Sequence, residues 1–469
     1  MHDNVKYKSV FKHYIAQKAV FMLLDFSVTN YKVFKETAQL NLHASNYDKA
    51  THEQSNVYVD QEKSLRILRS AVVYGANASG KTKLFESLAF LKRFVLESSK
   101  ESQQGTTIDI QPFLLSDTTK DAPTELEIVF LHDGSVYRYG FEVTRTAVLA
   151  EWLFVKPKSR EIQIFYRDTV ENTLETHAKL FRKGSLLQEE SLVRDNALML
   201  SVAAQFNDEL CSKVVTWFAE HLTVVSSIAE DRYKGYTMMK NDQEHFHQKL
   251  MHLMNVADFS IQDIRSKALD PETLSEDMPA EVKERILQRL VHEHAKIYDT
   301  CETIHHVYDQ HNHIAGSTNF SLDKDESHGT QRFFYLAGPI LDTLENGKTL
   351  FIDEFDARLH PILVLQLFSL FNNPAINMKG AQLVITTQNS ILLQSGVLRK
   401  DQVWFVEKDR FEAAHLYSLA DFKSTLARKR DNYEDYYLRG RYGAIPSVNL
   451  AQSFGEEAGE QESKWPAEK

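Results

Sequence analysis

The residues whose types and spacing could do chemistry begin at Gly75. Residues 75–82 read Gly-Ala-Asn-Ala-Ser-Gly-Lys-Thr and fit the pattern G-x-x-x-x-G-K-[ST]. Glycines let such a loop curl so that its N–H groups face phosphate oxygens, and the following helix adds its positive N-terminal end. Lys81 would reach the β- and γ-phosphates of ATP, and Thr82 would ligate Mg²⁺. The predicted phosphate-binding residues are Gly75, Ala76, Asn77, Ala78, Ser79, Gly80, Lys81 and Thr82.

A pair of acids forms the second candidate constellation. Residues 349–354 read Thr-Leu-Phe-Ile-Asp-Glu, an apolar strand pattern that ends in two carboxylates. Ligands of parallel sheets bind at the carboxyl ends of the strands, so we expect these acids beside the phosphate loop. Asp353 is predicted to hold Mg²⁺, directly or through water. Glu354 is predicted to polarise the attacking water as the general base.

The surrounding patterns indicate the elements that must position these residues. A β-rich run over 66–74 leads into the loop, and apolar residues at helical spacing follow Lys81. Residues 125–155 alternate around an Asp133-Gly134 turn and predict an antiparallel sheet. Residues 190–300 look mostly helical. The final third alternates helix and strand, which is the pattern of a parallel sheet.

Three further motifs carry a family resemblance. DEFDARLHP (353–361) resembles the Walker B and D-loop of ABC-type ATPases, and ESHGTQ (326–331) resembles their degenerate signature, S-x-G-T-[QR]. QLVITTQNSILL (382–393) lies where ABC-type ATPases usually carry a switch histidine. With NALMLSVAAQFN, DQVWFVEK and YYLRGRYGAIP, the chain resembles the stand-alone AAA/ABC-type ATPases of abortive infection and phage defence. These are similar to RloA and AbiL-type proteins and, more distantly, to the AriA subunit of PARIS and the PtuA subunit of Septu.

The resemblance implies an α/β P-loop NTPase of ABC type, with a mixed parallel sheet, an antiparallel β-subdomain and a helical insertion. It implies a composite site, in which Ser327 and Gly329 of one subunit close over the γ-phosphate bound by another. Gln388 stands at the switch position, where it can donate a hydrogen bond but cannot carry a proton, so hydrolysis is expected to be slow. Gln111 is a candidate Q-loop residue at the metal.

The expected organisation has five parts. Residues 1–21 are an N-terminal extension, and 22–190 hold the first part of the core with the phosphate loop and β-subdomain. Residues 191–300 are a helical insertion, and 301–454 complete the core with the signature, Walker B, D-loop and switch. The charged tail 455–469 is predicted to be disordered. Sustained heptads are missing, which argues against a long coiled coil.

The expected function is an Mg²⁺-ATP-dependent ATPase acting as the sensor or regulator of an anti-phage system. It would work as a homodimer or higher homo-oligomer and control a separate effector nuclease, RloB-like or Toprim-type. DNA or a phage component stays open as a further partner. Two alternatives also stay open: a RecF-like DNA repair ATPase, against which the net charge of -11 weighs, and an ATP-bound scaffold without turnover.

Bulk composition suggests the compartment. Only two cysteines occur, Cys211 and Cys301, which gives no disulfide framework and suits a reducing cytoplasm. The sequence offers no apolar run approaching the roughly 20 residues of a membrane span, so no membrane partner is expected. Three weaker patterns read as structural rather than catalytic: R-x4-H at 289–294, the histidines at 305, 306, 311 and 313, and the Arg/Tyr-rich segment 428–446.

Overall fold

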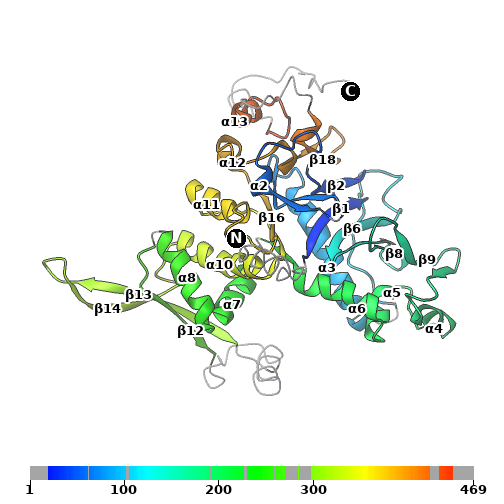
Figure 1. Cartoon of the computed structure of the whole chain (residues 1–469), viewed down its shortest axis with the longest axis horizontal. Coiled ribbons are helices and arrows are strands. Elements are labelled where there is room, and N and C mark those ends of the chain that lie inside the picture. The colour runs from blue at the N-terminus through cyan, green and yellow to red at the C-terminus, as the bar shows by residue number, and fades with distance from the viewer. Residues whose placement is uncertain are drawn as a thin grey trace, which may run out of the picture.

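Two sheets dominate the computed structural model (Figure 1). It describes residues 20–61, 63–101, 105–190, 192–226, 230–257, 259–269, 284, 297–422 and 432–446. The first is a core sheet with five neighbouring parallel strands and one antiparallel edge strand. In order, its strands are β11 (Leu222–Val225), β15 (Thr349–Ile352), β16 (Gln382–Thr386), β5 (Ser70–Tyr74), β17 (Val403–Lys408) and β18 (Ala414–Ser418). The predicted mixed α/β core is therefore confirmed.

The second sheet is antiparallel throughout and corresponds to the predicted β-subdomain. Its hairpin turn at Asp133-Gly134 is confirmed, since both residues have positive φ, 47° and 68°. In order, its strands are β10 (Thr173–Thr176), β9 (Ile162–Asp168), β8 (Val148–Lys156), β7 (Ser135–Val143), β6 (Thr124–His132), β1 (Met22–Thr29) and β2 (Ala38–Asn41). A short ribbon pairs β3 (Val57–Asp60) with β4 (Leu65–Leu68).

Both faces of the core sheet are covered. Ala71 and Val73 of β5 share one apolar core with helix α3 (Lys81–Glu101) and the antiparallel sheet. Val72 and Tyr74, on the opposite face, share another core with the helices after residue 328. Successive side chains of a strand point to opposite faces, so a sheet covered on both needs continuously apolar strands. This explains why every residue of β5, β15 and β16 is buried.

The remaining helices flank these sheets. On the core sheet lie α10 (His328–Asn346), α11 (Pro361–Phe371), α12 (Ile391–Gln394) and α13 (Tyr433–Leu438), with short 3₁₀ turns η4 (Lys400–Gln402) and η5 (Leu419–Asp421). Helices α5 (Met199–Gln205) and α6 (Glu209–Thr216) and the π-turn η1 (Trp217–His221) pack in the other core. Two further short helices are α2 (Glu53–Asn56) and α4 (Lys183–Glu189).

Helices α7 (Glu230–Asn241) and α8 (Glu244–Val256) form a lobe with α10 and share its apolar core with the core sheet. Helices α7 and α10 approach closely at Gly338, because a Cβ there would lie 2.1 Å from Thr237 Oγ1. From this lobe projects a three-stranded sheet of β12 (Asp263–Ala268), β13 (Tyr298–Tyr308) and β14 (Ile314–Ser321) (Figure 1).

The segment 191–300 differs from its predicted helical character in two places. β11 joins the core sheet parallel to β15, and β12 begins the projecting sheet. β11 is the four-residue run LTVV, which is too short for its periodicity to separate strand from helix. It becomes a strand because the edge of β15 offers it hydrogen bonds.

Some predicted segments cannot be compared with the structure. Residues 1–19 of the N-terminal extension, the pattern at 289–294 and the tail 455–469 lie outside the described residues. Among the helices that are described, none combines the length and apolar character that crossing a bilayer requires.

A buried carboxylate joins the antiparallel sheet to α5. Glu151 of β8 is 0% exposed and accepts hydrogen bonds from the Tyr139 hydroxyl (3.0 Å) and from the N–H groups of Met199 (2.6 Å) and Leu200 (2.9 Å). Burial raises the pKa of Glu151, while Arg167 at 3.9 Å opposes that shift. Glu151 therefore satisfies N–H groups in the first turn of a helix that has no side-chain cap of its own.

We predict that Glu151→Ala lowers the free energy of unfolding by about 3–5 kcal/mol. The change removes one partner of a buried ion pair and leaves buried N–H and O–H donors unpaired. Urea unfolding followed by fluorescence measures the difference. Glu171→Ala, in an exposed turn, is the control and should change stability little. Equal stability of the two variants would contradict this account of Glu151.

Candidate functional site

The phosphate loop is held in a tight curl between β5 and α3. Gly80 has φ of 121° and Ala78 has φ of 62°, both in the left-handed region. Gly75 cannot carry a side chain, since a Cβ would lie 2.5 Å from the carbonyl oxygen of Val406. The ammonium of Lys81 lies over the loop and donates to the carbonyls of Gly75 (2.7 Å) and Ala76 (3.0 Å).

The two acids lie at the end of β15, and one hydroxyl positions both. Thr386 Oγ1 donates to Asp353 Oδ1 at 2.6 Å and accepts from the backbone N–H of Glu354 at 2.8 Å. The other carboxylate oxygen, Asp353 Oδ2, is buried and finds no hydrogen-bond donor among the described residues. Buried polar atoms are normally paired, so this oxygen fits a cation that would supply the missing partner.

Glu354 leaves the strand in an unusual direction. Its φ of 50° lies in the left-handed region, which costs energy for a residue with a Cβ and so needs support from its surroundings. Support comes from Arg332 of α10, which is 1% exposed. Its guanidinium donates to the carbonyl oxygens of Glu354 (3.1 Å) and Asp353 (3.4 Å). The Glu354 side chain is exposed as a result, while Asp353 stays buried.

The loop and the acids form one electrostatic site. Burial lowers the pKa of Lys81, and the charges of three nearby carboxylates oppose this shift: Asp353, Asp356 and Glu354. Thr82 and Asp353 also line a single cavity of about 750 Å³ that runs along α3. Lys81, Thr82 and the acid pair, which lie far apart in the sequence, are therefore brought together at the carboxyl ends of β5 and β15.

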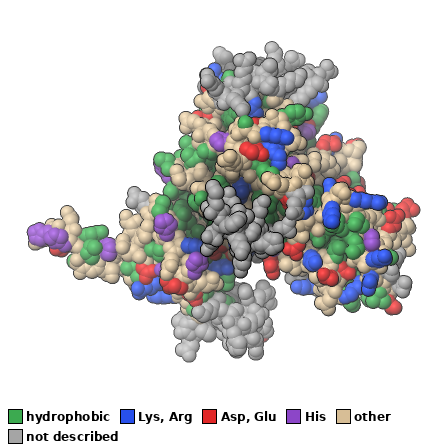
Figure 2. All heavy atoms as spheres, in the orientation of Figure 1, with side chains coloured by type: hydrophobic (Ala, Val, Ile, Leu, Met, Phe, Trp, Pro, Cys, Tyr) green, Lys and Arg blue, Asp and Glu red, His purple; other side chains and the backbone are tan. Residues whose placement is uncertain are grey.

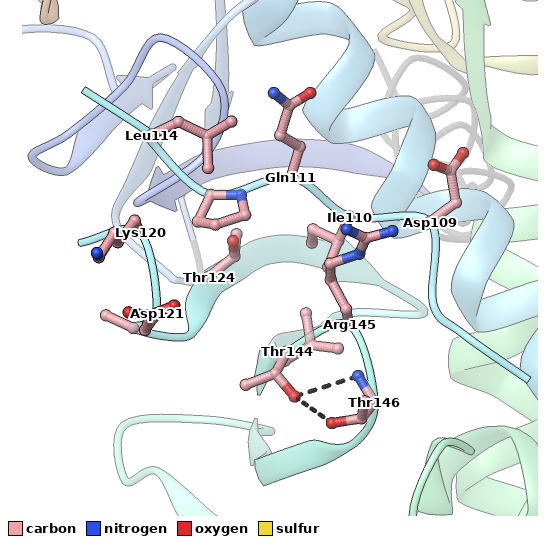
Figure 3. A pocket seen from close by; sticks show the side chains of 13 residues that line it. Asp109, Ile110, Gln111, Leu114, Lys120, Asp121, Thr124, Thr144, Arg145 and Thr146 are labelled. Carbon is pink, nitrogen blue, oxygen red and sulfur yellow. Dashed lines mark hydrogen bonds between the residues drawn. The ribbon is translucent and has the colours of Figure 1, made fainter. Parts of the chain in front are cut away.

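Gln111 lies in the segment between this cavity and a second one. It lines the larger cavity with Thr82 and Asp353, and its carbonyl accepts from the N–H of Lys32 at 2.9 Å. It also borders a hollow of about 520 Å³ on the antiparallel sheet. The Gln111 side chain lies on one side of the backbone around residue 111, and the side chains of Thr144 and Thr146 lie on the other (Figure 3). Gln111 therefore borders both cavities.

The signature residues begin helix α10. Ser327 is its N-cap and accepts a hydrogen bond from Thr330 N at 3.1 Å. Gly329 lies against the D-loop, since a Cβ would be 3.0 Å from the carbonyl oxygen of Arg358. Neither Ser327 nor Gly329 lines the cavity that Thr82 and Asp353 share. The signature and the phosphate loop are thus not brought together around this cavity within one chain.

The loop before Ser327 is tied to the projecting sheet. The Glu326 carboxylate accepts from Thr303 Oγ1 and lies 2.7 Å from His305 Nε2, both on β13. Gln331 of α10 donates to the carbonyl of Glu326 at 3.0 Å. These contacts fix the orientation of the signature loop relative to the strand.

Gln388 follows β16 and lies beside the D-loop. Its backbone N–H is 3.3 Å from Asp356 Oδ2, and its side chain is exposed. The predicted switch position is therefore held beside Asp356 of the D-loop by its backbone, with its side chain in solvent.

Sequence reasoning missed three residues of this site: Thr386, Arg332 and Lys32. Thr386 ends an apolar strand, and Arg332 lies in the first turns of α10, directly before the apolar run from Phe333, so a polar side chain at either point was the available signal. Lys32 lines the cavity and pairs with Glu86 at 2.6 Å. Its signal was weaker, because the turn Asn30–Lys32 becomes recognisable only through its positive φ values, 53° at Asn30 and 49° at Lys32.

Comparison with known proteins decides the family. Residues 70–394 match the model of the family described as "AAA domain, putative AbiEii toxin, Type IV TA system". That range includes the phosphate loop, the signature, the acid pair and Gln388. The chain belongs to this AAA domain family. It is thus a nucleotide-binding P-loop protein with an AAA domain.

Among solved structures, the chain is similar to an SMC head domain from Thermotoga maritima. The two sequences are 10% identical, and the TM-score is 0.36. The match covers 84% of this chain and 98% of that one. It is also similar to an SmcHead bound to the C-winged helix domain of ScpA, with 12% sequence identity and a TM-score of 0.36. That match covers 84% of this chain and 97% of the SmcHead chain. A third similar structure is cbiO1 from Clostridium perfringens, part of the ABC transporter complex cbiONQ, with 11% sequence identity and a TM-score of 0.24. That match covers 83% of this chain and 95% of the cbiO1 chain. No sequence among curated proteins matches this AAA domain protein significantly.

We predict that Thr386→Val weakens Mg²⁺-dependent activity by about 10–100-fold without unfolding the chain. The valine keeps the shape but removes the hydroxyl that orients Asp353 and the Glu354 amide. Steady-state ATPase assays across a Mg²⁺ titration measure the effect. Thr387→Val is the matched control, because the neighbouring hydroxyl contacts Asn389 N (3.0 Å) instead of the acids. Similar rates in the two variants would show that the Thr386 hydroxyl is dispensable.

Proposed function

We propose that this AAA domain protein binds Mg²⁺-ATP and hydrolyses it slowly between two head-to-head subunits. The observation that carries the proposal is the unpaired, buried oxygen of Asp353 on the cavity shared with Thr82, beside Lys81. A triphosphate would replace the carbonyl groups that Lys81 now contacts. The loop N–H groups and the N-terminus of α3 would bind the same phosphates.

The donor set suits a magnesium ion. Mg²⁺ prefers oxygen ligands and usually takes one or two from the protein, the rest from water and phosphate. Here Thr82 and Asp353 would hold it, with Gln111 on the same cavity wall. When bound, the ion would neutralise charge on the β- and γ-phosphates. Glu354, exposed beyond the strand, would accept a proton from the attacking water.

Closure of the site requires a second subunit in this proposal. Gly329 lies against the D-loop, and neither Ser327 nor Gly329 lines its own chain's cavity. At the N-terminus of α10 they would offer N–H groups to the γ-phosphate bound by another copy. Arg332 connects α10 to the carbonyls of Asp353 and Glu354. Closure of the signature of one subunit over its partner's nucleotide would therefore alter the acid pair of the first subunit.

A scaffold that binds ATP without turnover is the second candidate, and Gln388 favours it. An exposed amide can donate a hydrogen bond to a phosphate oxygen but cannot take up or release a proton. Slow hydrolysis and no hydrolysis therefore differ only in how well this amide replaces a histidine.

In the cell we propose a sensor or regulator role in anti-phage defence, with a separate effector nuclease under its control. The family description, which names a toxin of a type IV toxin–antitoxin system, and the motif resemblance support this role. A RecF-like repair function would require steeply salt-dependent DNA binding, and the net charge of -11 disfavours it.

We predict that Ser327→Arg leaves ATP affinity within about twofold but abolishes ATP-dependent dimerisation. The arginine would occupy the space that the second subunit's triphosphate needs, while its own phosphate loop is untouched. Fluorescent-nucleotide titration and sedimentation with Mg²⁺-ATP measure the two properties. Lys81→Ala is the opposite control and should lose nucleotide binding itself. Normal closure by Ser327→Arg would refute the composite site.

We predict that Glu354→Gln lowers kcat by at least about 100-fold, because the general base is lost while ATP binding is retained. Gln388→His should raise kcat by about tenfold, since a ring that can carry charge stabilises the developing γ-phosphate charge better than an amide. Single-turnover assays measure both. A wild-type rate equal to that of Glu354→Gln would favour the scaffold function.

A further inference from the structure

The loop after β16 carries Gln388 and is held on two sides. We call residues 387–390 the switch loop. On one side, the backbone N–H of Gln388 lies 3.3 Å from Asp356 Oδ2 of the D-loop. On the other side, the Ser390 hydroxyl donates to Glu434 Oε1 of α13 at 2.6 Å. Ser390 begins α12 but does not cap it with its side chain, so its hydroxyl serves Glu434 instead.

A third contact comes from the strand that leads into the phosphate loop. Tyr74, the last residue of β5, is 0% exposed, and its hydroxyl donates to the carbonyl of Asn389 at 3.1 Å. Burial raises the pKa of Tyr74, and three neighbouring groups raise it further: Tyr437, Asp356 and Glu434. The hydroxyl therefore keeps its proton and remains a donor to the switch loop.

Helix α13 is anchored by its own packing. Asn432 is its N-cap, and Glu434 lies in its first turn. The ring of Tyr437 lies 5.5 Å from that of Tyr74 and 5.6 Å from that of Phe405, within the apolar core. Glu434 and Tyr437 are three residues apart and so lie on the same face of the helix. The packing of Tyr437 on the core sheet therefore brings the Glu434 carboxylate to the switch loop.

These contacts lie away from the signature. α13 lies beside α12 at one end of the molecule, apart from the lobe of α7, α8 and α10 (Figure 1). The hairpin of β13 and β14, with histidines gathered at its tip, extends on another side (Figure 2). A change in α13 is therefore expected to alter the switch loop without touching the loop that carries Ser327.

The Gln388 side chain has no such support. It is exposed and makes no hydrogen bond within the part of the chain that the structure describes. Its amide can reach a phosphate only from the direction that the backbone gives it. Because a misplacement of about 1 Å can cost about 100-fold in rate, contacts that fix the loop determine how well this amide works.

We propose that Glu434 and Tyr74 are positioning residues that aim the Gln388 amide at the γ-phosphate. Neither would touch the nucleotide, since Glu434 acts through the Ser390 hydroxyl and Tyr74 through a backbone carbonyl. This role rests on the proposed hydrolysis of ATP. It makes α13, which lies outside the matched residues 70–394, a determinant of the rate of hydrolysis.

Glu434→Ala should lower kcat by about tenfold and leave ATP affinity within about twofold, because the switch loop is freed while the phosphate loop is untouched. Glu434→Gln keeps an oxygen that can accept from Ser390 and should retain most of the rate. Single-turnover assays and fluorescent-nucleotide titration of the full chain measure the two properties. Asp435→Ala is the matched control. It removes a charge from the same turn, but this carboxylate pairs with the exposed Arg439 at 2.9 Å, so the rate should stay that of wild type.

A second comparison separates positioning from a general structural role. In a Gln388→Ala background the amide is absent, so Glu434→Ala and Tyr74→Phe should each lower the rate no further. Loss of packing or of stability would instead lower the rate in both backgrounds, as independent changes do.

Hydrogen exchange of the nucleotide-free full chain tests the contact without any hydrolysis. The amides of residues 388–391 should exchange faster in Glu434→Ala than in wild type or Asp435→Ala. Unchanged exchange, a wild-type rate in Glu434→Ala, or a further loss of rate on top of Gln388→Ala would each overturn the proposal. A wild type that binds ATP but never hydrolyses it would contradict the proposed turnover, while faster exchange in Glu434→Ala would still show that Glu434 holds the loop. Failure of the contact and failure of the proposed ATP function are thereby distinguished.

Discussion

A single buried carboxylate oxygen, Asp353 Oδ2, is the constraint on which the rest of this structure depends. It is removed from water and has no donor among the described residues. Burying such a group is costly unless a hydrogen bond or a cation compensates. The surroundings lower that cost in part, through the Thr386 hydroxyl on the other oxygen and through the charge of Lys81. The remaining deficit is what the proposed Mg²⁺ ion would relieve.

The strand order explains how so few residues make the site. β16 lies between β15, which ends in the acids, and β5, which ends in the phosphate loop. The central strand therefore supplies the groups that touch both neighbours: Thr386 reaches the acids, and Thr387 N donates to Val73 O of β5 at 3.3 Å. Because all three strands are parallel, their functional ends meet at one edge.

A second lobe is mechanically connected to that edge. Arg332 links α10 to the carbonyls of the acid pair, and Glu326 links the signature loop to β13 of the projecting sheet. The lobe that begins at Ser327 is a packed continuation of the edge that carries the acid pair, joined to it by these polar contacts.

The sequence by itself determined the phosphate loop, the acid pair, the antiparallel sheet with its Asp133-Gly134 turn and the α/β class. Each of these is local: the spacing of Gly75, Gly80 and Lys81, or the apolar run before Asp353, is enough to recognise it. Only the tertiary structure decided that LTVV at 222–225 is a core strand, that Thr386 and Arg332 position the acids, and that Lys32 lines the cavity. The physical reason is the same in each case. Their conformations and partners come from segments distant in sequence, so the energy that selects them exists only once the sheet is assembled.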